Sequence, residues 1–148
     1  MASMADSKKS KEPVTARKSG SARSAAIVDD SPVSRAAVRE CLNTLGMTVV
    51  GEAADTGAGF HLFEQTRPDL VTVDLVMPQT EGMSTLDLVR SIKSLSRNTV
   101  VIAISTIPFE STQQKIIEAG ASAYIAKPVT ADKLRAVLSG TGTRKHPA

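Results

Sequence analysis

The sequence predicts a parallel α/β fold, a doubly wound five-stranded sheet that is covered by helices on both faces. Short aliphatic runs alternate with amphipathic stretches five times along the chain, which is the pattern of repeated strand and helix units. The aliphatic runs are nearly continuous, as expected for parallel strands that are buried on both sides. Aromatic residues are scarce, with three Phe, one Tyr and no Trp, so the core is expected to be mostly Val, Leu, Ile and Ala.

Five aliphatic runs are predicted to be strands, because each is short, is rich in branched side chains and is bounded by turn or polar residues. They cover residues 25–28, 48–50 or slightly more, 70–75, 100–104 and 123–126.

The first two helices follow from capping residues and apolar spacing. Ser31 and Pro32 start the first helix with a capping hydroxyl and a proline at the first helical position, and Gly46 ends it. Its apolar positions recur at helical spacing: Val33, Ala37, Val38, Cys41, Leu42 and Leu45. The second helix should cover roughly residues 57–65, although Gly57 and Gly59 weaken its start.

The last three helices show the same periodicity. One carries Leu86, Val89, Ile92 and Leu95 and runs to about Leu95. The next follows Pro108 and carries Ile116 and Ile117 before Gly120. The last begins near Thr130, a plausible cap, and buries Leu134, Val137 and Leu138 before Gly140.

The chain of 148 residues has enough material for one domain, which we place at residues 25–140. Residues 1–24 are expected to be a disordered, basic, Ser-rich tail, and residues 141–148 a flexible end. The tail carries six basic and two acidic residues, whereas residues 25–140 carry ten basic and thirteen acidic ones. We therefore expect no specific nucleic-acid surface on the folded part, while a weak hold on nucleic acid or acidic membrane through the tail stays open.

The cysteine content and the length of the apolar runs indicate the cellular compartment of the protein. Cys41 is the single cysteine, so an internal disulfide is impossible, and its place on the apolar face of the first helix favours a packing role. No run of about 18 apolar residues is available to span a bilayer, and no secretory signal is recognisable. A cytoplasmic protein is expected.

Polar residues stand where the predicted strands end. Asp29 and Asp30 follow the first strand, Asp74 lies at the end of the third, and Ser105 and Lys127 follow the fourth and fifth. In a doubly wound sheet ligands bind outside the carboxyl ends of the strands, so these groups are expected to converge at one edge. Carboxylates buried together need a compensating cation, and oxygen ligands suit Mg²⁺. The edge is therefore predicted to be a metal and phosphoryl site.

A carboxylate can also attack a phosphoryl group and form an acyl phosphate. Asp74 is the better nucleophile because it lies on the third, central strand, while Asp30 and Asp74 suit direct ligation of the metal. Mg²⁺, Lys127 and the Ser105 hydroxyl could each neutralise one phosphoryl oxygen.

In order and spacing, these residues resemble the receiver domain of bacterial response regulators over residues 25–140. The intervals from Asp30 to Asp74, Ser105 and Lys127 are 44, 31 and 22 residues in turn. The matching positions are Asp29, Asp30, Asp74, Met77, Pro78, Gly82, Ser105, Tyr124, Lys127 and Pro128. The resemblance implies a flavodoxin-like (βα)5 sheet, for which the strand order 2-1-3-4-5 is taken over from flavodoxin and CheY.

The resemblance also implies roles for the site residues. Asp74 would accept a phosphoryl group from the phosphohistidine of a sensor histidine kinase or from a small phosphodonor. Asp29, Asp30, Asp74 and the backbone carbonyl of Val76 would hold Mg²⁺ and its waters. Lys127, joined to Pro128 by a cis bond, would pair with the phosphoryl group.

A switch is implied as well. Ser105 would move toward the phosphoryl group and let Tyr124 turn inward, which remodels the face of helix four, strand five and helix five for an output partner. Such a protein is not an enzyme but a signalling phosphoacceptor that promotes its own phosphorylation and dephosphorylation.

Two positions depart from the usual family pattern. Thr106 stands where alanine or glycine is usual, which predicts narrower access to Asp74 and slower loss of the phosphoryl group. Val76 is apolar where many relatives are polar and cannot position an attacking water, which points the same way.

Plainer interpretations exist for single residues. Asp29 and Asp30 could serve only a helix N-terminus, Lys127 could be a strand exit, and Tyr124 could be a packing residue.

For the whole chain, we favour a single-domain response regulator, because little chain follows the fifth helix. The segments at residues 51–53 and 69–74 resemble those of stand-alone chemotaxis regulators, so the chemotaxis type is favoured. A phosphorelay intermediate or phosphate sink, which would exchange the group with a phosphotransfer protein, is the alternative. A Mg²⁺-dependent phosphohydrolase of the haloacid dehalogenase type is less favoured, because Val76 occupies the place of its second aspartate.

Overall fold

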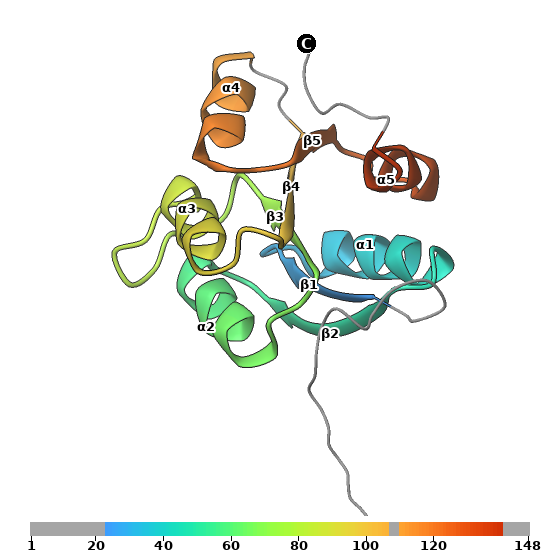
Figure 1. The fold of residues 1–148 in the computed structure, drawn as a ribbon, viewed down its shortest axis with the longest axis horizontal. Coiled ribbons are helices and arrows are strands. Elements are labelled where there is room, and N and C mark those ends of the chain that lie inside the picture. The colour runs from blue at the N-terminus through green and yellow to red at the C-terminus, as the bar shows by residue number, and fades with distance from the viewer. Residues whose placement is uncertain (1–22, 107–109, 141–148) are drawn as a thin grey trace, which may run out of the picture.

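The computed structural model describes residues 23–106 and 110–140, in which five strands alternate with five helices (Figure 1). The predicted tail and C-terminal end lie almost wholly outside these residues. In chain order the elements are β1 (Ser24–Val28), α1 (Pro32–Thr44), β2 (Thr48–Ala53), α2 (Thr56–Thr66), β3 (Leu70–Asp74), α3 (Thr85–Leu95), β4 (Val100–Ser105), α4 (Glu110–Ala119), β5 (Ala123–Ala126) and α5 (Ala131–Leu138).

All five strands pair in parallel in the order β2-β1-β3-β4-β5, which confirms the predicted sheet. β3 lies at the centre, and Asp74 pairs with Ile104 of β4 at its carboxyl end. β2 extends to Ala53, beyond the expected end at Val50, because it continues to pair with β1 up to Val28. A register shift between Ala25 and Ala26 accommodates the extra length.

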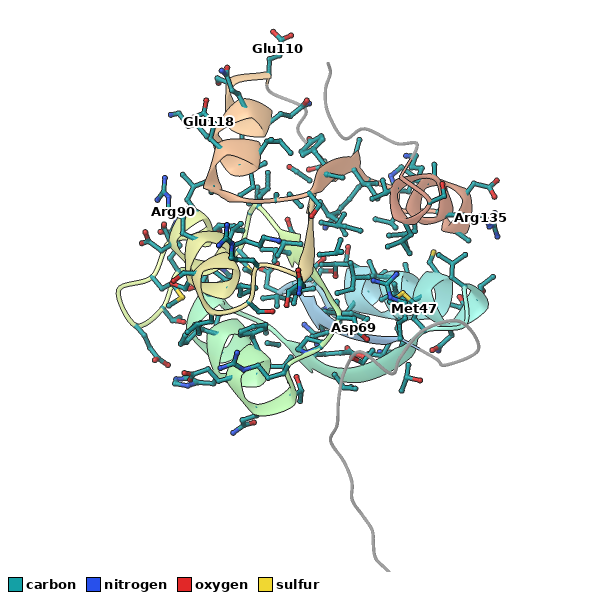
Figure 2. All side chains as sticks on the ribbon, in the orientation of Figure 1. Met47, Asp69, Arg90, Glu110, Glu118 and Arg135 are labelled. Atoms are coloured by element: carbon teal, nitrogen blue, oxygen red, sulfur yellow. The ribbon has the colours of Figure 1, made fainter. Side chains whose placement is uncertain are left out.

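Two aliphatic cores lie on opposite faces of the sheet. In Figure 1, α1 and α5 lie together on one side and α2, α3 and α4 on the other. The core under α1 and α5 includes Ile27, Leu42 and Leu134, all inaccessible to solvent. The core under α2, α3 and α4 includes Phe63 and Ile116, also buried. Charged side chains such as the labelled Arg90, Glu118 and Arg135 lie at the periphery of the molecule (Figure 2).

The predicted helix caps are present at α1 and α5. The Ser31 hydroxyl accepts a hydrogen bond from Ser34 N at 3.2 Å, and the Thr130 hydroxyl accepts one from Lys133 N at 3.1 Å. Gly46 has a φ of 83°, which lets the chain leave α1 in a left-handed conformation. Local chemistry therefore sets where these helices begin and end.

Four of the predicted apolar-face residues are exposed to solvent, the small Ala37 and three larger ones. Val33 is 80% exposed, Leu95 is 47% exposed and Ile117 is 44% exposed. Val33 lies in the first turn of α1, whereas Val38 and Leu42 further along the helix are buried. Helical spacing alone does not reveal which turns of a helix overlie the sheet.

Close packing explains why two glycines, Gly57 and Gly59, lie at the start of α2, where they disfavour the helix. At Gly59, a Cβ atom would lie 2.8 Å from Val28 Cγ1, so α2 approaches β1 too closely for a side chain. At Gly57, a Cβ atom would lie 2.7 Å from the Thr80 hydroxyl. α2 nevertheless begins at Thr56 because Asp55 caps it, accepting a hydrogen bond from Ala58 N at 2.8 Å.

Candidate functional site

The three aspartates that follow β1 and β3 come together at the carboxyl edge of the sheet. One carboxylate oxygen from each of Asp29, Asp30 and Asp74 lies within 4.8 Å of the others. Asp29 is 2% exposed and Asp74 is 5% exposed, whereas Asp30 is exposed to solvent. The structure thus brings together the predicted acidic residues, two of them buried.

Backbone hydrogen bonds orient the two buried carboxylates. Ser31 N donates to Asp29 Oδ1 at 2.9 Å, and Val76 N donates to Asp74 Oδ1 at 3.0 Å. Arg35 donates from Nη1 to the backbone carbonyl of Asp29 at 2.6 Å. Arg35 was not predicted to lie at this site; its place near the start of the helix after the acidic doublet is the signal that could have indicated it.

Lys127 reaches this cluster from the loop after β5, and the peptide bond that joins it to Pro128 is cis. Its Nζ lies 2.9 Å from Asp74 Oδ2 and 3.3 Å from Asp29 Oδ2. Lys133 of α5 donates to the carbonyls of Ala126 and Pro128, on either side of Lys127, at 3.0 and 2.9 Å. One ammonium group therefore faces two buried carboxylates, and a second lysine holds its loop.

Burial and charge act in opposite directions on this ion pair. Burial raises the pKa of Asp74, and the charge of Asp29 adds to this, against the hydrogen bonds from Val76 and Lys127. Burial alone would lower the pKa of Lys127, but its hydrogen bond to Asp74 and the charges of Asp74 and Asp29 raise it overall. Lys127 is thereby kept charged beside the carboxylates.

Ser105 and Tyr124 lie on the neighbouring strands. Ser105 ends β4, is 2% exposed, and pairs with Ala126 of β5, and its carbonyl accepts a hydrogen bond from Lys127 N at 2.9 Å. Tyr124 pairs with Ala103 and is half-buried against the core under α2, α3 and α4. The switch roles of both residues remain predictions.

A cavity of about 350 Å³ lies beside Lys127, between the start of α1 and the loops after β4 and β5. It is lined by Ser31, Val33, Ser34, Ala37, Val38, Thr106, Lys127, Pro128 and Val129. The exposed Val33 therefore forms part of a wall next to the site. Helical spacing had predicted that Val33 packs on the apolar face of the helix.

The acidic cluster fits a magnesium ion. Mg²⁺ prefers oxygen ligands in an octahedron and is commonly held by one or two carboxylates together with waters. Asp29, Asp30 and Asp74 supply carboxylate oxygens at a separation that one ion can bridge, and the exposed Asp30 leaves the site open to solvent. Two buried carboxylates facing one ammonium group also leave negative charge that a divalent cation would neutralise.

A doubly wound parallel sheet with clustered acids and a lysine at its carboxyl edge is typical of proteins that bind a phosphoryl group together with Mg²⁺. The sequence matches the response regulator receiver domain over residues 25–139, and the chain belongs to this family. It is a receiver domain of the two-component signalling systems, whose members use Mg²⁺ held in an acidic pocket and interact with histidine kinases, phosphotransfer proteins and output partners. Receiver domains act as phosphoacceptors and are not generally classed as enzymes.

Curated relatives include regulators of more than one kind. Chemotaxis protein CheY of Bacillus subtilis is 31% identical over 115 residues, which are 78% of this chain and 93% of that protein. The nitrate/nitrite response regulator NarL of Escherichia coli is 35% identical over 113 residues, 76% of this chain. The match spans about half, 51%, of NarL.

Solved structures have the same fold. A LuxR-family two-component response regulator from Aurantimonas superposes with a TM-score of 0.70 at 30% identity, covering 81% of this chain and 87% of that one. The receiver domain of NarL from Mycobacterium tuberculosis gives 0.71 at 27% identity, covering 83% and 98%. Among the helices of residues 23–106 and 110–140, none combines the length and apolar character needed to cross a membrane.

Proposed function

We propose that Asp74 is the phosphoacceptor of this chain and receives its phosphoryl group from the phosphohistidine of a sensor kinase or a phosphotransfer protein. The observation that carries the proposal is the 2.9 Å contact between Lys127 Nζ and Asp74 Oδ2, inside a cluster of three carboxylates. Asp74 is buried, oriented by Val76 N, and paired with a cation at the edge where parallel sheets bind ligands.

The transfer is a substitution at phosphorus. A carboxylate oxygen of Asp74 forms a bond to phosphorus while the bond from phosphorus to the donor imidazole nitrogen breaks, and the electron pair of that bond stays with the imidazole. The product is an acyl phosphate. Attack of water on its phosphorus would release inorganic phosphate and restore the Asp74 carboxylate.

The other site residues would position and neutralise the group. Asp29, Asp30, Asp74 and the backbone carbonyl of Val76 would hold Mg²⁺, which supplies positive charge to the phosphoryl oxygens when bound. Lys127, already kept charged by its two carboxylate partners, would pair with a further phosphoryl oxygen.

Phosphorylation would then alter a protein-binding surface. Ser105 would move toward the phosphoryl group, and the half-buried Tyr124 would turn inward, changing the face formed by α4, β5 and α5. Ile117 of α4 is 44% exposed and would be available to a protein partner there. The mildly acidic residues 25–140 support a protein partner over nucleic acid, and a cytoplasmic kinase would place the chain in the cytoplasm.

Chemotaxis-type signalling is the finer proposal. It rests on likeness to CheY, which the chain matches over 93% of that protein's length. The match to NarL means that a regulator of another pathway is the competing assignment. Loss of chemotaxis in cells that lack the chain, restored by the wild type and not by Asp74→Asn, would support the chemotaxis assignment.

The central claim is tested with acetyl phosphate and Mg²⁺, which can phosphorylate the chain without a kinase. The intact mass of the wild type is expected to increase by one phosphate, and that of Asp74→Asn is expected to stay unchanged. Asp69→Asn is the matched control, because Asp69 precedes the same strand at its opposite end, where it binds Ser24 N at 2.8 Å. A phosphate gain in Asp74→Asn, or none in the wild type, would contradict the proposal.

A further inference from the structure

The loop between β3 and α3 is fastened to the N-terminus of α2 by side-chain hydrogen bonds. The Thr80 hydroxyl donates to Asp55 Oδ1 at 2.7 Å and accepts from Gly57 N at 2.8 Å. Asp55 is the N-cap of α2, so Thr80 inserts between a helix cap and a free N–H group of the first turn. A residue of the loop thereby completes the capping of a helix that precedes it by 24 positions.

Thr56 holds the same loop from the other side. Its hydroxyl accepts a hydrogen bond from Thr80 N at 2.9 Å and donates to the carbonyl of Met83 at 2.8 Å. Its backbone N–H donates to the carbonyl of Pro78 at 3.3 Å. Thr56 is fully buried, so these bonds are shielded from competition with water. We call Asp55, Thr56 and Thr80 the α2 latch.

The fit between the two segments is close. A Cβ atom at Gly57 would lie 2.7 Å from the Thr80 hydroxyl oxygen and 2.8 Å from the carboxylate of Glu81. Outside the latch, the exposed His61 of α2 contacts Glu81 at 3.0 Å. A glycine at this place is therefore required by the loop packed against the helix and not by the helix itself.

The held loop begins at the acidic site. Val76, four residues before Thr80, donates its N–H to Asp74 Oδ1, and Met77 between them is buried. The position of the Val76 backbone therefore bears on the orientation of Asp74. The proposed function also assigns the Val76 carbonyl to the metal. A shift of the loop would move both groups together.

We infer that the α2 latch positions the backbone of Val76 and the carboxylate of Asp74 for Mg²⁺, and that Thr80 is a positioning residue for metal binding. The inference rests on the proposed function. Thr80 is not a metal ligand, since its hydroxyl is engaged with Asp55 and Gly57. A latch that served only to cap α2 would affect stability but not metal affinity, and this difference makes the inference testable.

The test measures the affinity for Mg²⁺ alone by isothermal titration calorimetry, with thermal unfolding of each variant in parallel. Thr80→Val keeps the shape of the side chain and removes the hydroxyl, and we expect its affinity to fall by roughly tenfold, as when residues that orient metal ligands are removed. Thr80→Ser restores the hydroxyl and is expected to restore the affinity. Thr66→Val makes the same change in the last turn of α2, where the hydroxyl donates to Leu62 O of the same helix, and is expected to bind Mg²⁺ like the wild type.

Gly57→Ala provides a second variant if Thr80→Val does not fold. The added methyl group displaces Thr80, while alanine favours the helix and so offsets the loss of stability. The inference would be overturned if folded Thr80→Val bound Mg²⁺ with the affinity of the wild type, or if Gly57→Ala did so where Thr80→Val does not fold. It would also be overturned if Thr66→Val lost as much Mg²⁺ affinity as Thr80→Val. Absence of Mg²⁺ binding by the wild type would instead overturn the proposed function on which the inference rests.

Discussion

Lys127 illustrates how single residues at this site combine structural and chemical roles. Its ammonium group compensates two buried carboxylates, and the same carboxylates are the proposed metal ligands. Lysine and metal therefore share the task of neutralising Asp29 and Asp74. If the lysine is removed, the stability of the folded protein should depend more strongly on Mg²⁺.

We expect Lys127→Met to lower the free energy of unfolding of the metal-free protein by about 1.5–3 kcal/mol, the usual cost of losing a hydrogen bond to a charged group. Added Mg²⁺ should then raise the melting temperature of the variant more than that of the wild type, because it neutralises the unpaired carboxylates. Thermal unfolding with and without MgCl2 measures both effects.

Lys93→Met is the matched control for this experiment. Lys93 is also partly buried, and burial lowers its pKa, but its hydrogen bonds within residues 23–106 and 110–140 go to the carbonyls of Arg97 and Thr99, far from the acids in sequence. Its substitution should destabilise the protein without changing the response to Mg²⁺. An equal Mg²⁺ response in the wild type and Lys127→Met would contradict the prediction.

Thr106 bears on the lifetime of the phosphorylated form. It is exposed and lines the cavity beside Lys127, whose Nζ contacts Asp74, so we expect its side chain to narrow the access of water to Asp74. We expect Thr106→Ala to lose its phosphoryl group several times faster than the wild type. The decay of the phosphorylated mass after removal of acetyl phosphate measures this, and equal decay rates would remove the hypothesis.

At the scale of the element, the N-terminus of α2 joins helix capping to loop position. Hydrogen bonds from Ala58 N and Thr80 Oγ1 lower the pKa of Asp55, against a weak opposing effect of burial. Because the folded-state pKa lies below the unfolded one, the stability from this carboxylate is fully present above about pH 4, the ordinary range of Asp, and is lost as the pH falls through the folded-state pKa.

Asp55→Ala is therefore expected to cost about 1 kcal/mol of unfolding free energy at neutral pH, the usual value of an N-cap. The cost should shrink as the solution is acidified. Urea unfolding of both proteins over a series of pH values measures the difference. Asp55→Asn keeps an uncharged capping acceptor, so the difference in unfolding free energy between Asp55→Asn and Asp55→Ala should not vary with pH. If the difference between the wild type and Asp55→Ala instead grows on acidification, the assigned direction of the pKa shift is refuted.

At the scale of the whole molecule, the sheet separates two cores that meet different helices. Ile116 lies in the core under α2, α3 and α4, and Ile27 in the core under α1 and α5, and both are inaccessible to solvent. We expect Ile116→Val and Ile27→Val each to cost about 0.5–1.5 kcal/mol. Because the two side chains belong to separate clusters, the double variant should equal the sum within about 0.5 kcal/mol in urea unfolding. A deviation of more than about 1 kcal/mol would show that the two cores are coupled through the sheet.

Much of this architecture could be predicted because its signals are local. The strand at 123–126 was predicted with the bounds that the structure has, and Ser31 and Thr130 cap the expected helices. Asp29 and Asp74 could be identified because each ends an aliphatic run, and strands of a parallel sheet place their carboxyl ends at one edge.

Other features depend on residues far apart in the chain. The extension of β2 to Ala53, the exposure of Val33 and the insertion of Thr80 into the start of α2 leave no pattern within a sequence window. The strand order 2-1-3-4-5, too, was taken over from related folds and not from the alternation of elements.

The sequence by itself determined the identity of the strands and helices, the capping residues and the chemical groups at the strand ends. The tertiary structure decided which groups meet, such as Lys127 with Asp29 and Asp74, and which apolar side chains remain exposed. The physical reason is that backbone preference and apolar periodicity act over a few residues, whereas packing and burial depend on how distant segments close on one another.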